Sequence, residues 1–233
     1  MDTNPFLFIN NHDNKDSGIG VLISGGVDSC VLISECSRNF AKTVPLYVKT
    51  GLFWENTELY WLKIFLQAIH STSLKELIIL TLPVEVIYKS HWSITGLNAP
   101  GFTDNDETVY LPGRNILLLS ISGIYCVTHG LKTIALGSLC GNPFPDATDL
   151  FFKNMESTIQ SGMSAKFSII TPYRSLKKSE VIERGKELPL ELTFSCINPR
   201  DNIHCGVCSK CAERIHAFQK SGIEDKTPYK QVY

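Results

Sequence analysis

The sequence predicts an α/β fold in which helices cover both faces of a parallel sheet. Short apolar runs alternate along the chain with segments whose apolar residues recur at helical spacing. The chain has 233 residues, 43% hydrophobic and 19% charged, which is enough for one large domain with a sizeable core. Sheets of this kind bind ligands beyond the carboxyl ends of their strands, so we expect the functional residues there.

The expected elements follow in regular order, without an internal repeat. The run 19–23 is wholly apolar, as in a buried strand, and the helix after it places Val31, Leu32 and Cys36 on one face. Strands are expected at 19–23, 45–49, 77–82, 133–137 and 167–170, and helices at 28–40, 57–69, 116–128, 147–163 and 177–188. The segment 83–112 contains several prolines and glycines and is expected to be irregular, as functional segments often are.

Composition and charge narrow the classes of function that fit the sequence. The formal net charge of −1 gives no overall attraction to nucleic acid or to an acidic membrane. The most apolar stretch, 116–127, is too short to span a bilayer and is expected to be a buried helix. The first residues lack the pattern of a signal peptide. Together with eight cysteines, this favours a cytoplasmic protein with a metal cluster and buried free thiols over a secreted disulfide protein.

Four of the cysteines form a C-x8-C-x2-C-x2-C pattern. The two-residue gaps let neighbouring thiolates converge on one ion, and four thiolates complete the tetrahedral shell of a structural zinc site. An iron–sulfur cluster could use the same ligands. The ligands would be Cys196, Cys205, Cys208 and Cys211. His204, beside them, is expected to face solvent, because four cysteines already saturate zinc.

The stretch SGGVDS, residues 24–29, comes directly after the first predicted strand. It is neither the usual nucleotide P-loop nor a dinucleotide fingerprint. Its glycines would let the backbone approach an anion, and the following helix would direct its positive end to the same point. Ser24 and Ser29 add hydroxyl groups, and Asp28 would either cap the helix or hold a magnesium ion. The alternative is a plain strand-to-helix turn.

These residues carry a family resemblance. SGGVDS resembles the loop of the N-type ATP pyrophosphatases, which cleave ATP between its α- and β-phosphates. The ordered set of SGGVDS, YLPGRN at 110–115, TPYRSLKKSE at 171–180, the cysteine cluster and SGIEDKTPY at 221–229 resembles the QueC family, 7-cyano-7-deazaguanine synthases. The resemblance spans 18–229. It implies a Rossmann-like fold of the adenine nucleotide alpha-hydrolase (HUP) type and three parts: an extension at 1–17, an ATP pyrophosphatase domain at 18–190, and a zinc-binding element with a C-terminal helix at 191–233.

The resemblance implies an ATP-dependent carbon–nitrogen ligase of queuosine biosynthesis. Such an enzyme adenylates the carboxylate of 7-carboxy-7-deazaguanine, releasing pyrophosphate, and amidates it with ammonia, releasing AMP. A second ATP then allows the amide to be dehydrated to the nitrile. The implied cofactors are ATP, Mg²⁺ and Zn²⁺, and a homodimer is expected by resemblance. The chemistry requires positioning and charge neutralisation rather than a side-chain nucleophile.

Individual residues carry over from the family motifs. Ser24, Gly25, Gly26, Asp28 and Ser29 would cradle the β- and γ-phosphates. Gly113, Arg114 and Asn115 would approach the nucleotide phosphates or the acyl-adenylate, with Asp28, Arg114 and Lys178 as the catalytic set. Glu180 could orient Lys178. The alternatives are a surface residue at a helix start for Arg114, and a solvated helix face for Lys178 and Glu180.

Two segments depart from the family pattern. KTGLFWE at 49–55 keeps Gly51, but Leu52 and Trp54 stand where Gln and His are expected. NPFPDAT at 142–148 keeps Asp146, which could read a guanine-like edge or cap the helix 147–163. Trp54 and Phe144 could stack on the heterocycle or belong to the core.

These losses leave the acceptor open. A second hypothesis is therefore a ligase that stops at the amide and joins the deazaguanine carboxylate to a protein or other amine, as in a defence-related modification. A zinc module that binds nucleic acid is disfavoured by the near-neutral charge and the complete SGGVDS loop.

Overall fold

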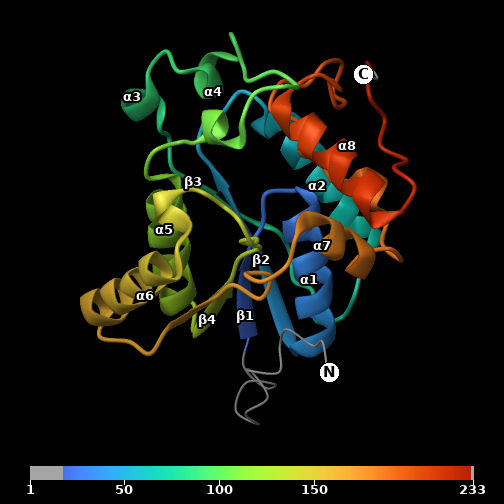
Figure 1. The fold of residues 1–233 in the computed structure, drawn as a ribbon. Helices are drawn as coiled ribbons and strands as arrows, with labels where there is room; N and C mark the ends of the chain where they lie inside the picture. Colours follow the sequence, from blue (N-terminus) through green and yellow to red (C-terminus); the bar gives the residue numbers. More distant parts are fainter. Residues whose placement is uncertain (1–17, 232–233) are drawn as a thin grey trace.

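The structure, a computed structural model, describes residues 18–231 and is built on a five-stranded parallel sheet in the order β3-β2-β1-β4-β5 (Figure 1). The strands are β1 (Gly18–Leu22), β2 (Lys42–Lys49), β3 (Ile78–Thr81), β4 (Thr133–Ala135) and β5 (Ser168–Ile170). All four pairings are parallel, with β1 in the centre between β2 and β4. The predicted α/β class is confirmed. The extension expected at 1–17 lies outside the described residues.

Helices cover both faces because the chain changes direction across the sheet. From β1 to β3 it moves one way, which places α1 (Val27–Asn39) and α2 (Glu55–Ala68) on one face. It then crosses back to β4 and β5, which places α5 (Arg114–Thr128) and α6 (Asp149–Met163) on the other face (Figure 1). The helix α7 (Lys178–Arg184) returns to pack beside α1.

Each face has its own hydrophobic cluster. One joins α1, α2 and α7 around side chains such as Val31, Leu62 and Val181. The other joins α5 and α6 to the sheet around Leu119 and Phe152. A third cluster lies beyond the strand ends, where the four cysteines of the expected metal site pack with apolar residues of the segments after β2 and β3.

The segment 83–112 is less irregular than predicted. It contains the short helices α3 (Glu85–Tyr88) and α4 (Trp92–Thr95) and the 3-10 turn η3 (Asp106–Val109). It reaches the C-terminal part of the chain through a bridge between Gly101 and Cys208. The segment therefore connects the sheet to the cysteine cluster.

The C-terminal part contains η5 (Leu190–Leu192) and α8 (Ser209–Ser221), which packs against α7 (Figure 1). We call residues 193–214 the cysteine element. The predicted boundary between the ATP pyrophosphatase domain and the zinc-binding element, between 190 and 191, falls inside η5 and remains a prediction. Within residues 18–231, no helix combines the length and the apolar character that crossing a bilayer requires.

Two expectations about burial are wrong. The helix expected to be buried, α5, is buried on one face only, and Ile116 and Ile124 are 47% and 52% exposed. Of the four cysteines outside the cluster, three are buried thiols, but Cys140 is exposed because it lies in the loop beyond the end of β4. An apolar run shows that a helix packs, but not that it is covered on all sides.

Element boundaries also differ from the predicted ones. The strand β2 begins at Lys42 rather than at Pro45, because the register with β1 starts at Gly18. The helix α6 begins at Asp149, after the 3-10 turn η4 (Pro145–Ala147). The helix α7 ends at Arg184, and Gly185 then lies so close to Val31 that a Cβ at that position would clash.

Candidate active site

The SGGVDS loop joins the carboxyl end of β1 to α1. Gly25 has a φ angle of +79°, and a Cβ there would lie 3.2 Å from Cγ of Glu58, so both conformation and space favour glycine. The serines close the turn themselves: Ser29 Oγ donates to the carbonyl oxygen of Gly26 at 3.0 Å and accepts from the amide of Ser24 at 3.2 Å. The loop is thus held tight by its own residues.

The start of α1 lacks a side-chain cap. Its N-cap residue is Gly26, and no side chain bonds to the first-turn amides. Asp28 lies in the first turn and does not cap the helix, so that alternative for Asp28 is wrong. Uncapped amides and the positive end of the helix dipole favour a bound anion. The loop therefore has the properties of a phosphate site.

A cavity of about 210 Å³ lies in front of this loop. It is bordered by the ends of β1 and β4, where the order of the strands reverses, which is the usual ligand site of such sheets. The start of α5 forms its opposite wall and contributes Arg114 and Asn115. The fold thereby brings the SGGVDS and YLPGRN motifs, far apart in the sequence, to one cavity.

Arg114 is the cation of this cavity. Gly113 precedes it as the N-cap of α5, with a φ angle of +75°. The Arg114 Nε atom is buried and has no hydrogen-bond partner within the described residues. A buried guanidinium nitrogen without a partner is costly in a protein interior, so this atom is suited to a ligand oxygen.

Asp146 holds the start of α5. Its Oδ2 accepts from the amide of Asn115 at 2.9 Å, and the side-chain amide of Asn115 donates to the Asp146 carbonyl oxygen at 2.8 Å. The expected alternative, a cap for the helix 147–163, is wrong, because Thr148 caps α6. A carboxylate at the N-terminus of α5 also offsets the unfavourable position of Arg114 next to a positive dipole end.

Lys178 connects the loop to α8. Its Nζ lies 3.3 Å from Oδ2 of Asp28 and 2.5 Å from Oε1 of Glu213. Burial raises the pKa of Asp28, and the Lys178 charge opposes this shift. Burial lowers the pKa of Lys178, but the two carboxylates outweigh it and raise that pKa above its ordinary value. Glu180 does not join this group; its Oε2 accepts from the amide of Lys177 at 2.7 Å and so caps α7.

Two cavity residues were missed from the sequence. Glu58 of α2 is 7% exposed, and Tyr47 of β2 donates a hydrogen bond of 2.6 Å to its Oε2. Burial raises the pKa of Glu58 to about 8, against the opposing effects of the Tyr47 hydrogen bond and the Arg114 charge. The available signal was an acid beside Leu59 and Leu62 on the apolar face of a helix.

The four cysteines form a compact group. Their Sγ atoms all lie within 4.8 Å of one another, and all four residues are buried. The pairs Cys196–Cys208 and Cys205–Cys211 are 3.8 and 3.9 Å apart. The amides of Asn198 and Cys205 donate to Sγ of Cys196, each at 3.3 Å. Converging sulfurs that accept backbone amides have the arrangement of a metal site.

His204 does not face solvent, and that expectation is wrong. It is 1% exposed, and its Nε2 accepts from the amide of Ser195 at 3.1 Å. Its ring packs against Phe194, whose amide donates to the carbonyl oxygen of Gly25 at 2.7 Å. His204 therefore belongs to the packing between the cysteine element and the SGGVDS loop.

Comparison with known families assigns the chain. A family model described as "Queuosine biosynthesis protein QueC" matches residues 19–222. The chain belongs to the QueC family. The predicted recognition is thereby confirmed, and with it the ATP pyrophosphatase type of the α/β fold.

Curated relatives of this QueC family member are named 7-cyano-7-deazaguanine synthases. A protein named 7-cyano-7-deazaguanine synthase from Nautilia profundicola is 30% identical over 91% of this chain and 97% of its own length. A 7-cyano-7-deazaguanine synthase 1 from Desulfitobacterium hafniense is 31% identical over 85% and 90%. Among solved structures, a 4-thiouridine synthetase bound to RNA and ATP covers 88% of this chain and 50% of its own, with a TM-score of 0.48 and 13% identity.

The two segments that depart from the QueC pattern border the cavity through Glu55 and Asn142, but the substrate residues expected in them lie elsewhere. Trp54 is 4% exposed and stacks on Trp92, with ring centroids 5.8 Å apart. Phe144 stacks on Tyr110 at 4.9 Å, and Gly51 lies against the Glu85 carboxylate. Asp146 contacts Asn115 from behind the cavity wall. None of these four residues is among the described residues that line the 210 Å³ cavity. Their role in substrate binding stays a prediction.

Proposed function

We propose that this QueC family member is an ATP-dependent synthase that converts 7-carboxy-7-deazaguanine and ammonia into 7-cyano-7-deazaguanine. The names of its relatives support the overall reaction. The observation that carries the proposal is the single cavity shared by the SGGVDS loop, the uncapped start of α1 and Arg114. That set of groups suits a triphosphate whose charge must be neutralised while it is attacked.

The proposed reaction has two adenylation steps. A carboxylate oxygen of the substrate attacks the α-phosphorus of ATP, the bond to the bridging oxygen of the β-phosphate breaks, and pyrophosphate leaves. Ammonia then displaces AMP and loses a proton, which gives the amide. The amide oxygen attacks the α-phosphorus of a second ATP, pyrophosphate leaves, and the nitrogen loses one proton. AMP and the second N–H proton then leave to give the nitrile.

The residues of this chain would act by charge and position. Arg114 would donate its free Nε to a phosphate oxygen, and the α1 amides would bind the departing pyrophosphate. Asp28 has a buried Oδ1 without a partner in the described chain, which suits a magnesium ion. When bound, that ion would neutralise charge on the phosphates. Lys178 would hold Asp28 in its orientation.

We further propose that the four cysteines hold one structural zinc ion. Thiolates about 2.3 Å from a tetrahedral zinc lie about 3.8 Å from one another. The two measured sulfur pairs, at 3.8 and 3.9 Å, agree with that spacing. An iron–sulfur cluster separates its thiolates more widely, because the cluster lies between them. Elemental analysis that finds iron in place of zinc would contradict this assignment.

A second candidate is the ligase that stops at the amide and uses a protein or another amine as acceptor. The observation that favours it is that Leu52 and Trp54 are buried and do not line the cavity, so neither reaches the substrate as Gln and His would. A homodimer and a cytoplasmic location stay predictions.

The decisive experiment incubates the protein with ATP, magnesium, 7-carboxy-7-deazaguanine and ammonium, and follows the products by mass spectrometry. Nitrile with AMP and pyrophosphate supports the synthase. Amide alone, or an adduct on a protein acceptor, supports the ligase. If no pyrophosphate forms under any condition, both proposals fail.

A matched pair of variants tests the site itself. Arg114→Gln removes the cavity cation and should lower kcat/KM by about a hundredfold. Arg38→Gln removes an exposed arginine in the last turn of α1 and should have little effect. Equal activity of the two variants would show that Arg114 does not act on the phosphates.

A further inference from the structure

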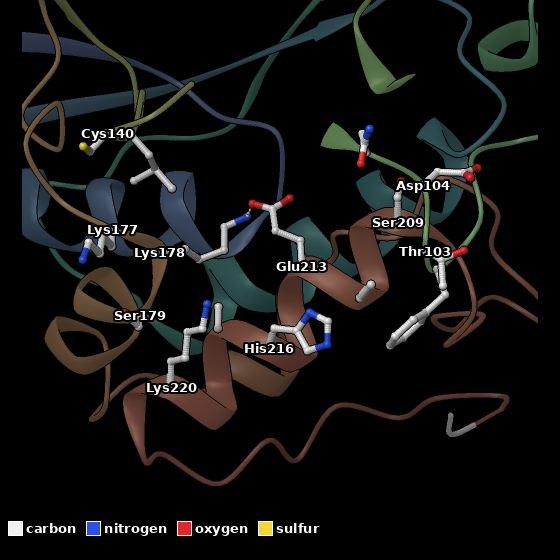
Figure 2. Close-up of a pocket in the computed structure, with 15 residues that line it drawn as sticks. Thr103, Asp104, Cys140, Lys177, Lys178, Ser179, Ser209, Glu213, His216 and Lys220 are labelled. Carbon is white, nitrogen blue, oxygen red and sulfur yellow. Dashed lines mark ion pairs between the residues drawn. The ribbon is translucent and has the colours of Figure 1, made fainter. Parts of the chain in front are cut away.

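A second and larger cavity, of about 770 Å³, lies between α7 and α8 (Figure 2). Its walls are the loop 102–105, the residues after β4, the start of α7 and one face of α8. The face of α8 consists of Ser209, Glu213, His216 and Lys220, which recur at helical spacing and so line one side of the helix. None of the expected substrate residues lines this cavity.

The two cavities are neighbours. Asp28 lines the SGGVDS cavity and Lys178 lines the larger one, and their side chains are only 3.3 Å apart. The strand-end segment after β4 is likewise shared: Gly137 and Ser138 border the first cavity, and Leu139 and Cys140 border the second. One ion pair and one short backbone segment thus separate the second cavity from the phosphate loop.

The charge of the larger cavity favours an anion. Figure 2 shows Lys178 and Glu213 pointing toward each other at its inner end. Glu213 also pairs with Lys210 at 2.7 Å, so its negative charge is compensated twice. Lys177 and Lys220, on two different helices, have no ion pair among the described residues and are exposed. The remaining acid, Asp104, accepts from the amide of Gly101 at the exposed rim.

A buried hydroxyl group provides an independent sign of a ligand. Ser209 is 4% exposed, lines the cavity, and its Oγ has no hydrogen-bond partner in the described chain. It is the first residue of α8, a helix whose N-cap makes no side-chain hydrogen bond to the first-turn amides. A buried polar group needs a partner, and a helix start favours an anionic one. The hydroxyl group and the N-terminus of α8 therefore also favour an anionic ligand, as the lysines do.

We propose that this cavity binds inorganic pyrophosphate, taken over from the SGGVDS loop past Lys178. The proposal rests on the proposed function in that adenylation releases pyrophosphate beside Asp28. Lys178 contacts carboxylates on both sides, Asp28 at the loop and Glu213 in the larger cavity, so its charge acts on both cavities. A flat heterocycle fits less well, because the two aromatic rings in the described lining, Phe102 and His216, pack edge-on against each other.

The test is a binding experiment that needs no turnover. Pyrophosphate with magnesium is titrated by calorimetry into protein saturated with a non-cleavable ATP analogue, α,β-methylene-ATP. Because the analogue fills the SGGVDS loop, the proposal expects one remaining pyrophosphate site. If the analogue abolishes pyrophosphate binding, the anion binds only at the loop and the proposal is overturned.

Variants locate the site. The double change Lys177→Gln with Lys220→Gln should weaken this remaining binding by about tenfold, since two exposed cations are lost. The affinity for the ATP analogue should stay the same. Lys153→Gln, an exposed lysine on α6 across the sheet, is the matched control and should leave both affinities unchanged. Pyrophosphate affinity equal in the double variant and the control would overturn the assignment.

Ser209→Ala tests the second observation. Loss of the hydroxyl should weaken pyrophosphate binding about threefold to tenfold. Because Ser209 follows a cysteine of the cluster, thermal unfolding is measured alongside, and the lysine variants decide if this variant does not fold. A protein that binds pyrophosphate in this way but makes no nitrile would refute the proposed function and leave the site standing.

Discussion

The SGGVDS loop and the cysteine element meet at one backbone hydrogen bond, from Phe194 to Gly25, but they are stabilised by different means. The side-chain hydrogen bonds of the two loop serines join residues no more than five positions apart, and Asp28 alone reaches further, to Lys178. The cysteine element depends on groups from distant positions, because Arg214 bonds to Thr193 and Thr227 and the four thiolates converge. The comparison teaches that the loop owes its shape mainly to its own residues, whereas the element needs the completed fold.

Loss of one thiolate should have the largest effect. Cys208→Ala leaves three sulfurs for the metal, and a structural zinc site supplies roughly 10 kcal/mol of folding free energy. We expect loss of bound metal and failure of the cysteine element to fold, measured by elemental analysis and by thermal unfolding. Cys140→Ala, at an exposed thiol outside the cluster, is the control. Unchanged metal content in Cys208→Ala would show that the cysteine element does not depend on four converging thiolates, and its contrast with the SGGVDS loop would fail.

Arg214 should come next. Its side chain is 1% exposed and donates to Thr193 Oγ1 at 2.8 Å and to Thr227 Oγ1 at 2.9 Å. Arg214→Met keeps much of the volume but leaves these acceptors unpaired, so unfolding free energy should fall by about 2–4 kcal/mol. Urea denaturation measures this loss. Arg200→Met, an exposed arginine of the same element, should change stability by less than about 0.5 kcal/mol.

Cys208 and Arg214 also show which features of the site can be predicted from a sequence and which cannot. The cysteines and the SGGVDS loop were predictable because their chemistry depends on local spacing. Arg214, Glu58 and Glu213 were not, because their partners come from other elements and a charged residue in a helix usually faces water. Asp146 was predicted to read the substrate or, as the alternative, to cap the helix 147–163, and its bond to the start of α5 became apparent only in the structure.

The helices and strands show the same difference between features that depend on local sequence and features that depend on distant contacts. Alternating apolar runs predicted all five strands and the longer helices except α8, which only the family resemblance implied. They did not predict the short helices of 83–112, because four-residue helices are stabilised by tertiary contacts such as the stacking of Trp92 on Trp54 rather than by a periodic pattern.

A change within the loop should cost less than one in the cysteine element. Gly25→Ala places a side chain at a φ angle of +79° and 3.2 Å from Glu58. We expect a loss of about 1–3 kcal/mol in unfolding free energy, together with weaker ATP binding. Gly162→Ala is the matched control: this glycine lies in α6 with open space around it, so the change should stabilise by about 0.5–1 kcal/mol. Equal stability of both variants would show that neither the φ angle of Gly25 nor its closeness to Glu58 requires glycine.

For a change of one pH unit, the smallest expected effect is the pH dependence at Glu58. Its folded-state pKa is raised to about 8 from a model-compound value of 4.5, so between these values the folded state keeps a proton that the unfolded state has lost. This group therefore makes stability fall as the pH rises from about 4.5 to 8, by on the order of 1 kcal/mol per pH unit.

Glu58→Gln removes that dependence and can still accept the Tyr47 hydrogen bond. Urea denaturation at several pH values should show the variant gaining on the parent protein toward pH 8. Glu183→Gln, at an exposed acid of α7, should follow the parent. Parallel curves for the parent protein and Glu58→Gln would contradict the raised pKa.

The bond between Gly25 and Phe194 has a consequence for protein synthesis. The central strand β1 and its loop are made early, yet β1 receives its partner β4, and Gly25 its partner Phe194, only when much later parts of the chain have left the ribosome. A nascent chain that ends before the cysteine element has the whole SGGVDS motif but lacks the hydrogen bond from Phe194 to Gly25. Nucleotide binding should therefore develop late in translation, when the two ends of the catalytic domain can meet.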